Sequence, residues 1–248
     1  TKLVAHSRGA AKKLSSGIDY LLQKNNVTLY RGEAVVTGKC KLSVTTESKT
    51  LALDAMHIIL ATGARSRQLP GLTIDGDRVW GAREAMTPTV LPDRLLIIGA
   101  GAIGMEFASL YGDLGSKVTI VEALDRVLAA EDREISERAA KAFTRRGISI
   151  ETSATVANLR TVGDHVEADI DSPRGPISVR ADRAIVAIGV TGNIENLGLE
   201  ALGVTTQRGF ITTDPWCRTN LVGLYAIGDV AGAPWLAHKA SHEAILCV

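Results

Sequence analysis

One glycine-rich segment near the middle of the chain constrains the fold more than any other feature. The apolar run Leu95–Ile98 leads directly into Gly-Ala-Gly-Ala-Ile-Gly at residues 99–104. Apolar residues at helical spacing follow, and a second apolar run, Lys117–Val121, ends at Glu122. This order predicts a buried strand, a tight turn, a helix and a second parallel strand. It is the dinucleotide-binding fingerprint with its complete strand–helix–strand context.

Each glycine of the fingerprint has a separate predicted task. Gly99 makes the tight turn, Gly101 lets a pyrophosphate approach the backbone, and Gly104 lets the helix pack closely on the strand. The helix N-terminus offers free N–H groups and the positive end of the helix dipole to the phosphates. The alternative, that the glycines serve only a turn, leaves the strands, the helix and the terminal acid unexplained. We therefore predict cofactor contacts from Gly99, Ala100, Gly101, Ala102, Ile103 and Gly104.

The acid at the end of the second strand predicts the kind of nucleotide. Glu122 stands about 20 residues beyond the glycines, where a carboxylate accepts hydrogen bonds from the adenosine ribose hydroxyls. A carboxylate there would repel the 2′-phosphate of NADP. Arg126 lies four residues further on, in a pattern that can simply begin a loop. We therefore predict NAD rather than NADP.

Composition excludes several classes of protein. The chain has 248 residues, a formal net charge of +1 and 46% hydrophobic residues, which is ordinary for a soluble globular protein. The charge gives no reason to expect nucleic-acid binding, and neither a membrane-length apolar run nor a signal-peptide pattern is present. Cys40, Cys217 and Cys247 are far apart and match no metal-ligand spacing. We predict free thiols, no metal site and a cytoplasmic location.

The order of apolar runs predicts an α/β protein in which small antiparallel β layers lie across parallel sheets. A nucleotide-binding domain is predicted at 91–216, flanked by 1–90 and 217–248, which together would belong to an incomplete second domain. The chain begins inside a helical pattern and ends in an apolar segment without a cap, so we expect a fragment of a longer protein. The predicted strands are 27–31, 34–37, 41–45, 50–53, 56–60, 95–98, 117–121, 148–151, 154–162, 166–171, 177–179, 184–189 and 224–229. Four helices are predicted. The first contains Leu14–Leu22, the second follows Gly101, the third spans 133–146 and the fourth begins near Trp235.

Three signatures in order resemble the pyridine nucleotide–disulfide oxidoreductases, flavoproteins that bind two dinucleotides. They are Ala61–Ala64 with Leu69–Gly71, the fingerprint with Glu106 and Glu122, and Leu224–Asp229 with Leu236–Ala240. Within this family the chain looks most similar to the dihydrolipoamide dehydrogenase branch. That likeness comes from Val121-Glu122 with Asp125-Arg126, from Asn196–Glu200 and from Leu236–Glu243. The resemblance covers essentially the whole chain.

The resemblance implies a three-layer (β/β/α) Rossmann-like NAD domain inserted in a partial FAD domain of the same type. On the NAD side it adds Glu106, Val156 beside the adenine and Gly189 near the nicotinamide to the fingerprint and Glu122. Taken alone, Glu106 reads as a surface acid and His238 as a packed polar residue. On the FAD side the resemblance implies contacts from Ala34, Thr62, Gly63, Ala64, Asp229, Trp235, Leu236, Ala237 and His238. Asp229, which follows a glycine at a strand end, also suits a carboxylate that accepts hydroxyl donors, although a simple Gly-Asp turn is the alternative.

The family pattern also contains parts that this sequence does not show. An FAD fingerprint and a redox-active cysteine pair would precede Thr1, and an interface domain with a catalytic histidine and glutamate would follow Val248. The arginine that the family carries after the glycine of the late strand is replaced by Val190. No catalytic residue is therefore predicted within the chain.

The resemblance implies that the parent protein oxidises dihydrolipoamide through a cystine pair and FAD and passes the electrons to NAD. The parent would be a homodimer and a component of a 2-oxo acid dehydrogenase complex, whereas the fragment would bind NAD, hold FAD weakly and lack turnover. Two alternatives stay open. One is another flavoenzyme of the disulfide or mercuric reductase type, although those commonly use NADPH. The other is a non-catalytic NAD-binding module.

Overall fold

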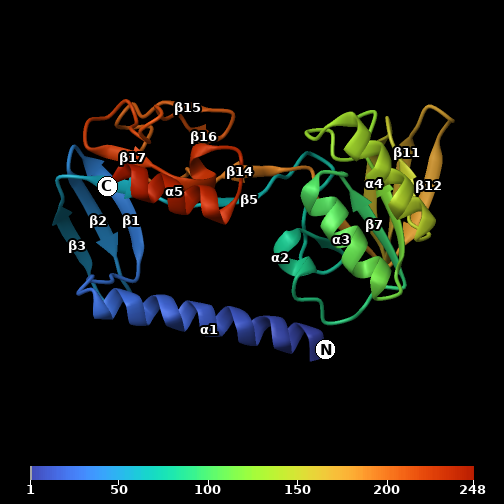
Figure 1. Ribbon diagram of the computed structural model, residues 1–248, viewed down its shortest axis with the longest axis horizontal. Coiled ribbons are helices and arrows are strands. Elements are labelled where there is room, and N and C mark those ends of the chain that lie inside the picture. Colours follow the sequence, from blue (N-terminus) through green and yellow to red (C-terminus); the bar gives the residue numbers. More distant parts are fainter. Residues whose placement is uncertain (1) are drawn as a thin grey trace. The chain divides into compact units, whose positions relative to one another are not determined.

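The computed structural model describes residues 2–248, which form two compact units (Figure 1). The fingerprint unit consists of Ser66–Gly189 with the start of the chain up to Ala10, and the flanking unit of Ala11–Arg65 with Val190–Val248. The sequence placed the domain boundaries at 90/91 and 216/217. The boundaries of the two structural units differ from these predicted ones, because Val79–Trp80 pairs with the fingerprint sheet and because Leu199 and Ile211 pack in the flanking core. The cofactor assigned to each domain stays a prediction.

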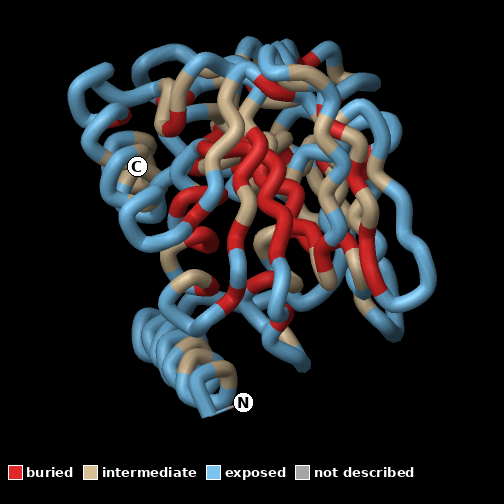
Figure 2. The backbone as a smooth tube through the Cα atoms, turned by 90° about the vertical axis from the view of Figure 1, so that its right-hand side faces the viewer, coloured by how far each residue is buried: buried red, intermediate tan, exposed pale blue. Residues whose placement is uncertain are grey.

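A five-stranded parallel sheet forms the centre of the fingerprint unit. Its order is β6-β13-β7-β8-β9, and every pair of neighbours is parallel. After a first arginine, the central strands β7 and β13 are continuous apolar runs, which is typical of parallel strands covered on both faces. Figure 2 shows that the buried residues are concentrated along these central strands. Their bounds are β6 Val79–Trp80, β7 Arg94–Ile98, β8 Lys117–Val121, β9 Ser149–Glu151 and β13 Arg183–Val186.

Helices cover one face of this sheet and an antiparallel sheet covers the other. Helices α2 (Ala82–Ala85), α3 (Ala102–Asp113) and α4 (Arg133–Arg145) contribute to a core with Leu95 and Ile97 of β7. The alternate residues of β7, Leu96 and Ile98, pack with the β10-β11-β12 sheet. These strands span Thr155–Val162, His165–Asp171 and Ile177–Ala181. The resulting three layers, β/β/α, confirm the predicted fold class.

The flanking unit consists of small sheets and two helices. Strands β1-β2-β3 form an antiparallel sheet, β4 and β17 a parallel pair, and β14-β5 and β15-β16 two-stranded sheets. Helix α1 (Lys2–Lys24) carries residues of both units and buries none of them. The other bounds are β1 Glu33–Gly38, β2 Lys41–Thr45, β3 Thr50–Asp54, β4 Ile58–Leu60, β5 Ala64–Ser66, β14 Val190–Gly192, β15 Thr206–Gln207, β16 Phe210–Ile211, β17 Leu224–Ala226, the 3₁₀ turn η1 Gly228–Ala231 and α5 Ala237–Cys247.

Most predicted elements are present, but the strand predicted at 27–31 is wrong. Val27, Leu29 and Tyr30 lie exposed in a loop before β1, because β-favouring residues form a strand only where a neighbouring strand pairs with them. The short elements α2, β5, β6 and β14–β16 were missed. Among the helices of residues 2–248, none combines the length and apolar character needed to cross a membrane.

Candidate dinucleotide-binding sites

The predicted NAD contacts gather at one edge of the fingerprint sheet. Strand β7 ends at the turn that begins with Gly99, β8 ends before Glu122, and β13 is followed after two residues by Gly189. Because these strands are parallel neighbours, their carboxyl ends meet at the same edge. This edge is where open α/β sheets bind ligands.

The three fingerprint glycines differ in their surroundings. Gly99 has φ +104°, and a Cβ there would collide with the carbonyl of Ala187, the residue that follows the neighbouring strand β13. A Cβ on Gly104 would collide with the carbonyl of Gly99, so the helix packs directly on the turn. A Cβ on Gly101 would find nothing within 4 Å. The backbone at Gly101 therefore faces open space, which is what a bound pyrophosphate needs.

Helix α3 begins beside this space without a side-chain cap. Gly101 is its N-cap residue, and no side chain accepts a hydrogen bond from the first turn. Gly101 and Ala102 are exposed, while Ala100 is buried and Ile103 is partly buried. The uncapped N–H groups and the helix dipole suit an anionic ligand. The residues present thus fit the phosphates of a dinucleotide.

The Glu122 carboxylate lies next to the turn. Its Oε2 accepts a hydrogen bond from the Ala100 N–H at 2.6 Å, and its Oε1 accepts one from Leu124 at 2.8 Å. The side chain is partly buried. Each carboxylate oxygen can accept a further hydrogen bond, so ribose hydroxyls can still bind it. The carboxylate is held at the mouth of the turn, as the sequence predicted.

The loop after Glu122 supports the turn and restrains Arg126. Leu128 has φ +49°, an uncommon conformation for a leucine, and its N–H donates to the Ala100 carbonyl at 2.8 Å. The Arg126 guanidinium pairs with Asp125 at 3.1 Å and donates to the Ala129 carbonyl at 2.8 Å. A hydrogen bond from Arg133, with the positive charges of Arg126 and Arg133, lowers the pKa of the Asp125 carboxyl. Arg126 is thus bound within its own loop.

The remaining predicted NAD contacts lie around the same edge. Glu106 is exposed just beyond the first turn of α3, which contains no acidic residue. Val156 is the second residue of β10, pairs with Ile170 and packs partly buried against the second core. Gly189 has φ +103°, and a Cβ there would find nothing within 4 Å. Their contacts with a nucleotide stay a prediction.

The predicted FAD contacts of the flanking unit include two turns at one strand edge. Strands β4 and β17 are parallel, and the Ile227 N–H donates to the Leu60 carbonyl at 2.9 Å just beyond them. Residues 62–64 follow β4, and Gly228 and Asp229 follow β17. The Asp229 side chain is partly buried and accepts no hydrogen bond from any described residue. A carboxylate of this kind suits hydroxyl donors of a ligand.

Asn193 fixes the turn after β4. The Thr62 hydroxyl donates to the Asn193 carbonyl at 2.8 Å, and the Asn193 side-chain amide donates to the Thr62 carbonyl at 2.9 Å. The Asn193 N–H donates to the Gly63 carbonyl at 3.0 Å. Arg65 adds two hydrogen bonds to Glu195, at 2.6 and 2.9 Å. The Arg65 guanidinium lowers the pKa of Glu195 to about 2, chiefly through this hydrogen bonding.

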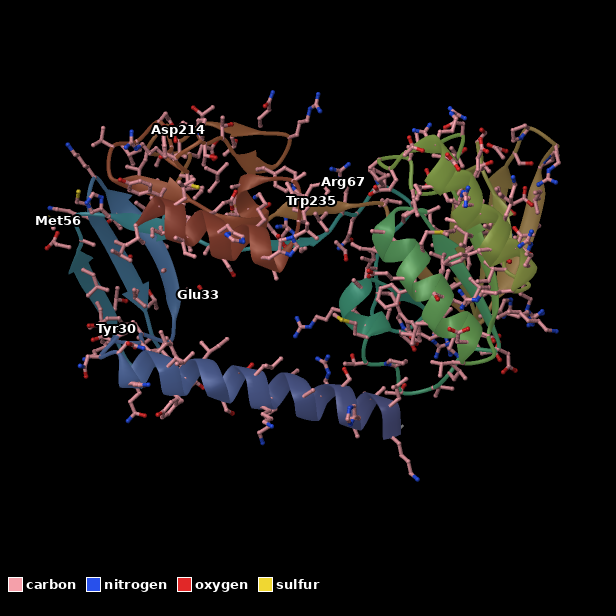
Figure 3. All side chains as sticks on the ribbon, viewed as in Figure 1. Tyr30, Glu33, Met56, Arg67, Asp214 and Trp235 are labelled. Carbon is pink, nitrogen blue, oxygen red and sulfur yellow. The ribbon has the colours of Figure 1, made fainter. Side chains whose placement is uncertain are left out.

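The other predicted FAD contacts are exposed. Residues 235–238 span the start of α5, whose N-cap Leu236 makes no side-chain cap. Figure 3 shows Trp235 at this end of α5, where its ring lies 5.7 Å from that of Phe210. Ala34 lies on β1, in a different sheet from β4 and β17. Contact of these residues with FAD stays a prediction.

Comparison with known proteins identifies the family. A family model described as pyridine nucleotide-disulphide oxidoreductase matches residues 2–244. The chain belongs to this family. It is 47% identical to a dihydrolipoyl dehydrogenase of Zymomonas mobilis over 247 residues, which cover 99% of this chain and 53% of that protein. The chain spans about half the length of the curated relatives it matches.

Solved structures support the same family assignment. LpdA from Mycobacterium tuberculosis matches with a TM-score of 0.90 and 29% identity, covering 99% of this chain and 55% of that one. The flavoprotein disulfide reductase RclA from Escherichia coli matches with a TM-score of 0.81 and 25% identity, covering 99% and 58%. RclA, a flavoprotein disulfide reductase, is of the class of redox enzymes that the sequence motifs predicted.

Sequence reasoning assigned no role to the residues that hold the predicted site turns. Arg65, Asn193 and Glu195 fix the turn after β4, and nothing in their sequence spacing indicates this. Lys239 and Glu243 bind the turn that carries Asp229. Their spacing of four residues on a predicted helix was the available signal for a pair.

Proposed function

We propose that the full-length protein is a dihydrolipoamide dehydrogenase that transfers electrons from dihydrolipoamide through a cystine pair and FAD to NAD. The 47% identity to the dihydrolipoyl dehydrogenase of Zymomonas mobilis supports this assignment. FAD supplies the two-electron chemistry when bound, and the protein supplies binding and orientation. We further propose that the full-length protein acts in the cytoplasm as a homodimer within a 2-oxo acid dehydrogenase complex.

Within the described chain, we assign NAD binding to the fingerprint unit. The observation that carries this proposal is the Glu122 carboxylate held 2.6 Å from the Ala100 N–H, beside the uncapped start of α3. The phosphates would bind the amide groups of residues 101–104, and the ribose hydroxyls would donate to Glu122. Arg126 pairs within its own loop, so it offers no free cation for a 2′-phosphate. These features favour NAD over NADP.

We assign FAD binding to the flanking unit. Asp229 would accept hydrogen bonds from flavin hydroxyls, and the turn at Thr62–Ala64 would approach the phosphates. The start of α5 would lie along the flavin, mainly through its backbone. Two features support this assignment: the Asp229 carboxylate accepts no hydrogen bond from residues 2–248, and the N-cap residue of α5, Leu236, provides no side-chain cap.

Titration calorimetry of the 248-residue chain with NADH and NADPH tests the NAD assignment. We expect NADH to bind at least about tenfold more tightly, because one repulsive charge contact is worth about that much. In Glu122→Gln the amide oxygen can still accept from one backbone N–H, while the negative charge is lost. This variant is expected to bind NADH more weakly than the wild type does and to lose most of the preference for NADH over NADPH.

Glu134→Gln is the matched control, because Glu134 is an exposed acid on α4 whose partner is Arg138. It is expected to bind both nucleotides like the wild type. Equal affinity of the wild type for NADH and NADPH would contradict the assignment. Tighter binding of NADPH than of NADH would favour the second candidate, a flavoenzyme of the disulfide or mercuric reductase type.

A further inference from the structure

The turn that carries Asp229 is bound at both ends by two side chains of α5. The Lys239 ammonium donates to the Gly228 carbonyl at 3.1 Å and to the Gly232 carbonyl at 3.0 Å. The Glu243 carboxylate accepts a hydrogen bond from the Gly228 N–H at 2.7 Å. Lys239 and Glu243 also pair with each other at 2.9 Å. One ion pair therefore engages three backbone groups that bracket the turn.

This pair differs from an ordinary ion pair on a helix surface. The Lys239 and Glu243 side chains are only 15% and 22% exposed. Lysine and glutamate are seldom buried to this degree unless they are paired and hydrogen-bonded. The pair Glu134–Arg138 on α4 has the same spacing, but its side chains are 70% and 74% exposed. The comparison indicates that the α5 pair serves the turn rather than the helix alone.

Close backbone packing leaves the turn little freedom. Gly228 has φ +70°, and a Cβ on it would lie 3.1 Å from the Cβ of Ala240 on α5. The turn thus packs directly on the helix between Lys239 and Glu243. Asp229 follows Gly228 immediately, and its carboxylate accepts no hydrogen bond from the described residues. Its position is fixed by its backbone rather than by partners of its own.

We propose that Lys239 and Glu243 are positioning residues for the flavin, a role that rests on the proposed function. They bind the Asp229 turn to the helix whose first turn follows Trp235. Both predicted flavin contacts, the carboxylate and the start of α5, are thereby held in one rigid arrangement. A carboxylate that must accept directional hydrogen bonds from ligand hydroxyls binds more tightly when its position is set beforehand.

The test compares FAD affinity in the full-length protein with and without the pair. Lys239→Met keeps an unbranched side chain, one atom shorter, and removes the two hydrogen bonds and the ion pair that the ammonium makes. We expect the FAD dissociation constant to rise by roughly tenfold or more, since hydrogen bonds from charged groups are the stronger class. The visible absorption band of bound flavin is expected to shift as well. The NADH affinity of the variant should stay close to wild type, while the melting temperature of the apoprotein is expected to fall modestly because the Glu243 carboxylate loses its cation.

Two further variants make the result specific. Glu243→Gln can still accept from the Gly228 N–H and loses only its charge, so we expect a smaller loss of FAD affinity, between wild type and Lys239→Met. This graded loss tests the proposal even where Lys239→Met fails to fold. Arg138→Met breaks the matched exposed pair on α4 and is expected to leave FAD affinity unchanged.

The outcomes separate this proposal from the proposed function. A wild-type full-length protein that binds no FAD would contradict the proposed function, and the positioning role would fall with it. A wild type that binds FAD, with Lys239→Met and Glu243→Gln both retaining its FAD affinity and spectrum, would overturn the positioning role alone. A loss of NADH affinity by the same factor as the loss of FAD affinity would also overturn it, because it would indicate that the pair has only a general structural role.

Discussion

Individual residues of the fingerprint divide into those that shape the turn and those that leave room for a ligand. Gly99 and Gly104 are required by contacts within the protein, because a Cβ at either position would collide with a backbone carbonyl. Gly101 has no such contact. A glycine that the fold itself does not require indicates a ligand that approaches the backbone at that point.

This difference gives a paired prediction for Gly101→Ala and Gly104→Ala. Gly104→Ala is expected to lower the free energy of unfolding by about 1–3 kcal/mol, because the added methyl group overpacks the turn. Gly101→Ala, at an N-cap with ordinary φ, is expected to cost less than about 1 kcal/mol. It should nevertheless weaken NADH binding at least about tenfold by blocking the pyrophosphate. Urea denaturation and NADH titration measure the two effects, and unchanged NADH binding in Gly101→Ala would contradict the assigned role.

Among the elements, α3 connects the fingerprint to α2, a second helix of the same layer. Tyr111 is fully buried, and its hydroxyl donates to the Ala85 carbonyl of α2 at 2.7 Å. Burial raises the pKa of Tyr111 from 10.0 to about 12. The neutral hydroxyl is therefore favoured in the folded state. It contributes stability that is complete below pH 10 and is lost as the pH rises toward 12.

Removing this hydroxyl tests the connection between α3 and α2. Tyr111→Phe is expected to lower the free energy of unfolding by about 1–3 kcal/mol at pH 7, because the buried Ala85 carbonyl loses its donor. Tyr20→Phe on α1 is the control, since Tyr20 is 62% exposed, and should change stability little. Chemical denaturation of both variants provides the comparison. Equal stability of Tyr111→Phe and wild type would show that the hydrogen bond contributes nothing net.

At the scale of the whole molecule, segments far apart in sequence are joined by a few polar contacts. In the flanking unit, Arg65 and Glu195 form a bidentate pair 130 positions apart. Because the pKa of Glu195 is depressed to about 2, its ionised form is favoured in the folded state. The pair therefore contributes stability above the ordinary pKa of 4.5, and this contribution is lost as the pH falls toward 2.

Glu195→Gln should remove this pH dependence. At pH 7 the variant is expected to be less stable than wild type by no more than about 1 kcal/mol, because both side chains are about half exposed and solvent screens the pair. The difference should shrink as the pH is lowered from 5 to about 2.5. Urea denaturation at several pH values measures it, with Glu200→Gln, an exposed glutamate of the same unit, as control. A difference that stays constant with pH would contradict the ion-pair explanation.

The sequence by itself determined the parts of the molecule that depend on local pattern. Strands β7 and β8, helix α3 and the position of Glu122 follow from apolar periodicity and from glycines at fixed spacing. The three-layer fold follows from the order of these elements. This information is local, because each strand or helix presents its apolar face within a few residues.

Only the tertiary structure decided which distant residues meet. In the structure the main segment of the fingerprint unit extends from Ser66 to Gly189. Residues 27–31, whose composition favours a strand, form none because no neighbouring strand pairs with them. The tertiary structure also placed Asn193 against the turn at Thr62, and Lys239 and Glu243 around Gly228. These contacts depend on how separate elements pack. Hydrogen bonds of this kind join residues at irregular separations along the chain, so no periodic pattern in the sequence predicts them.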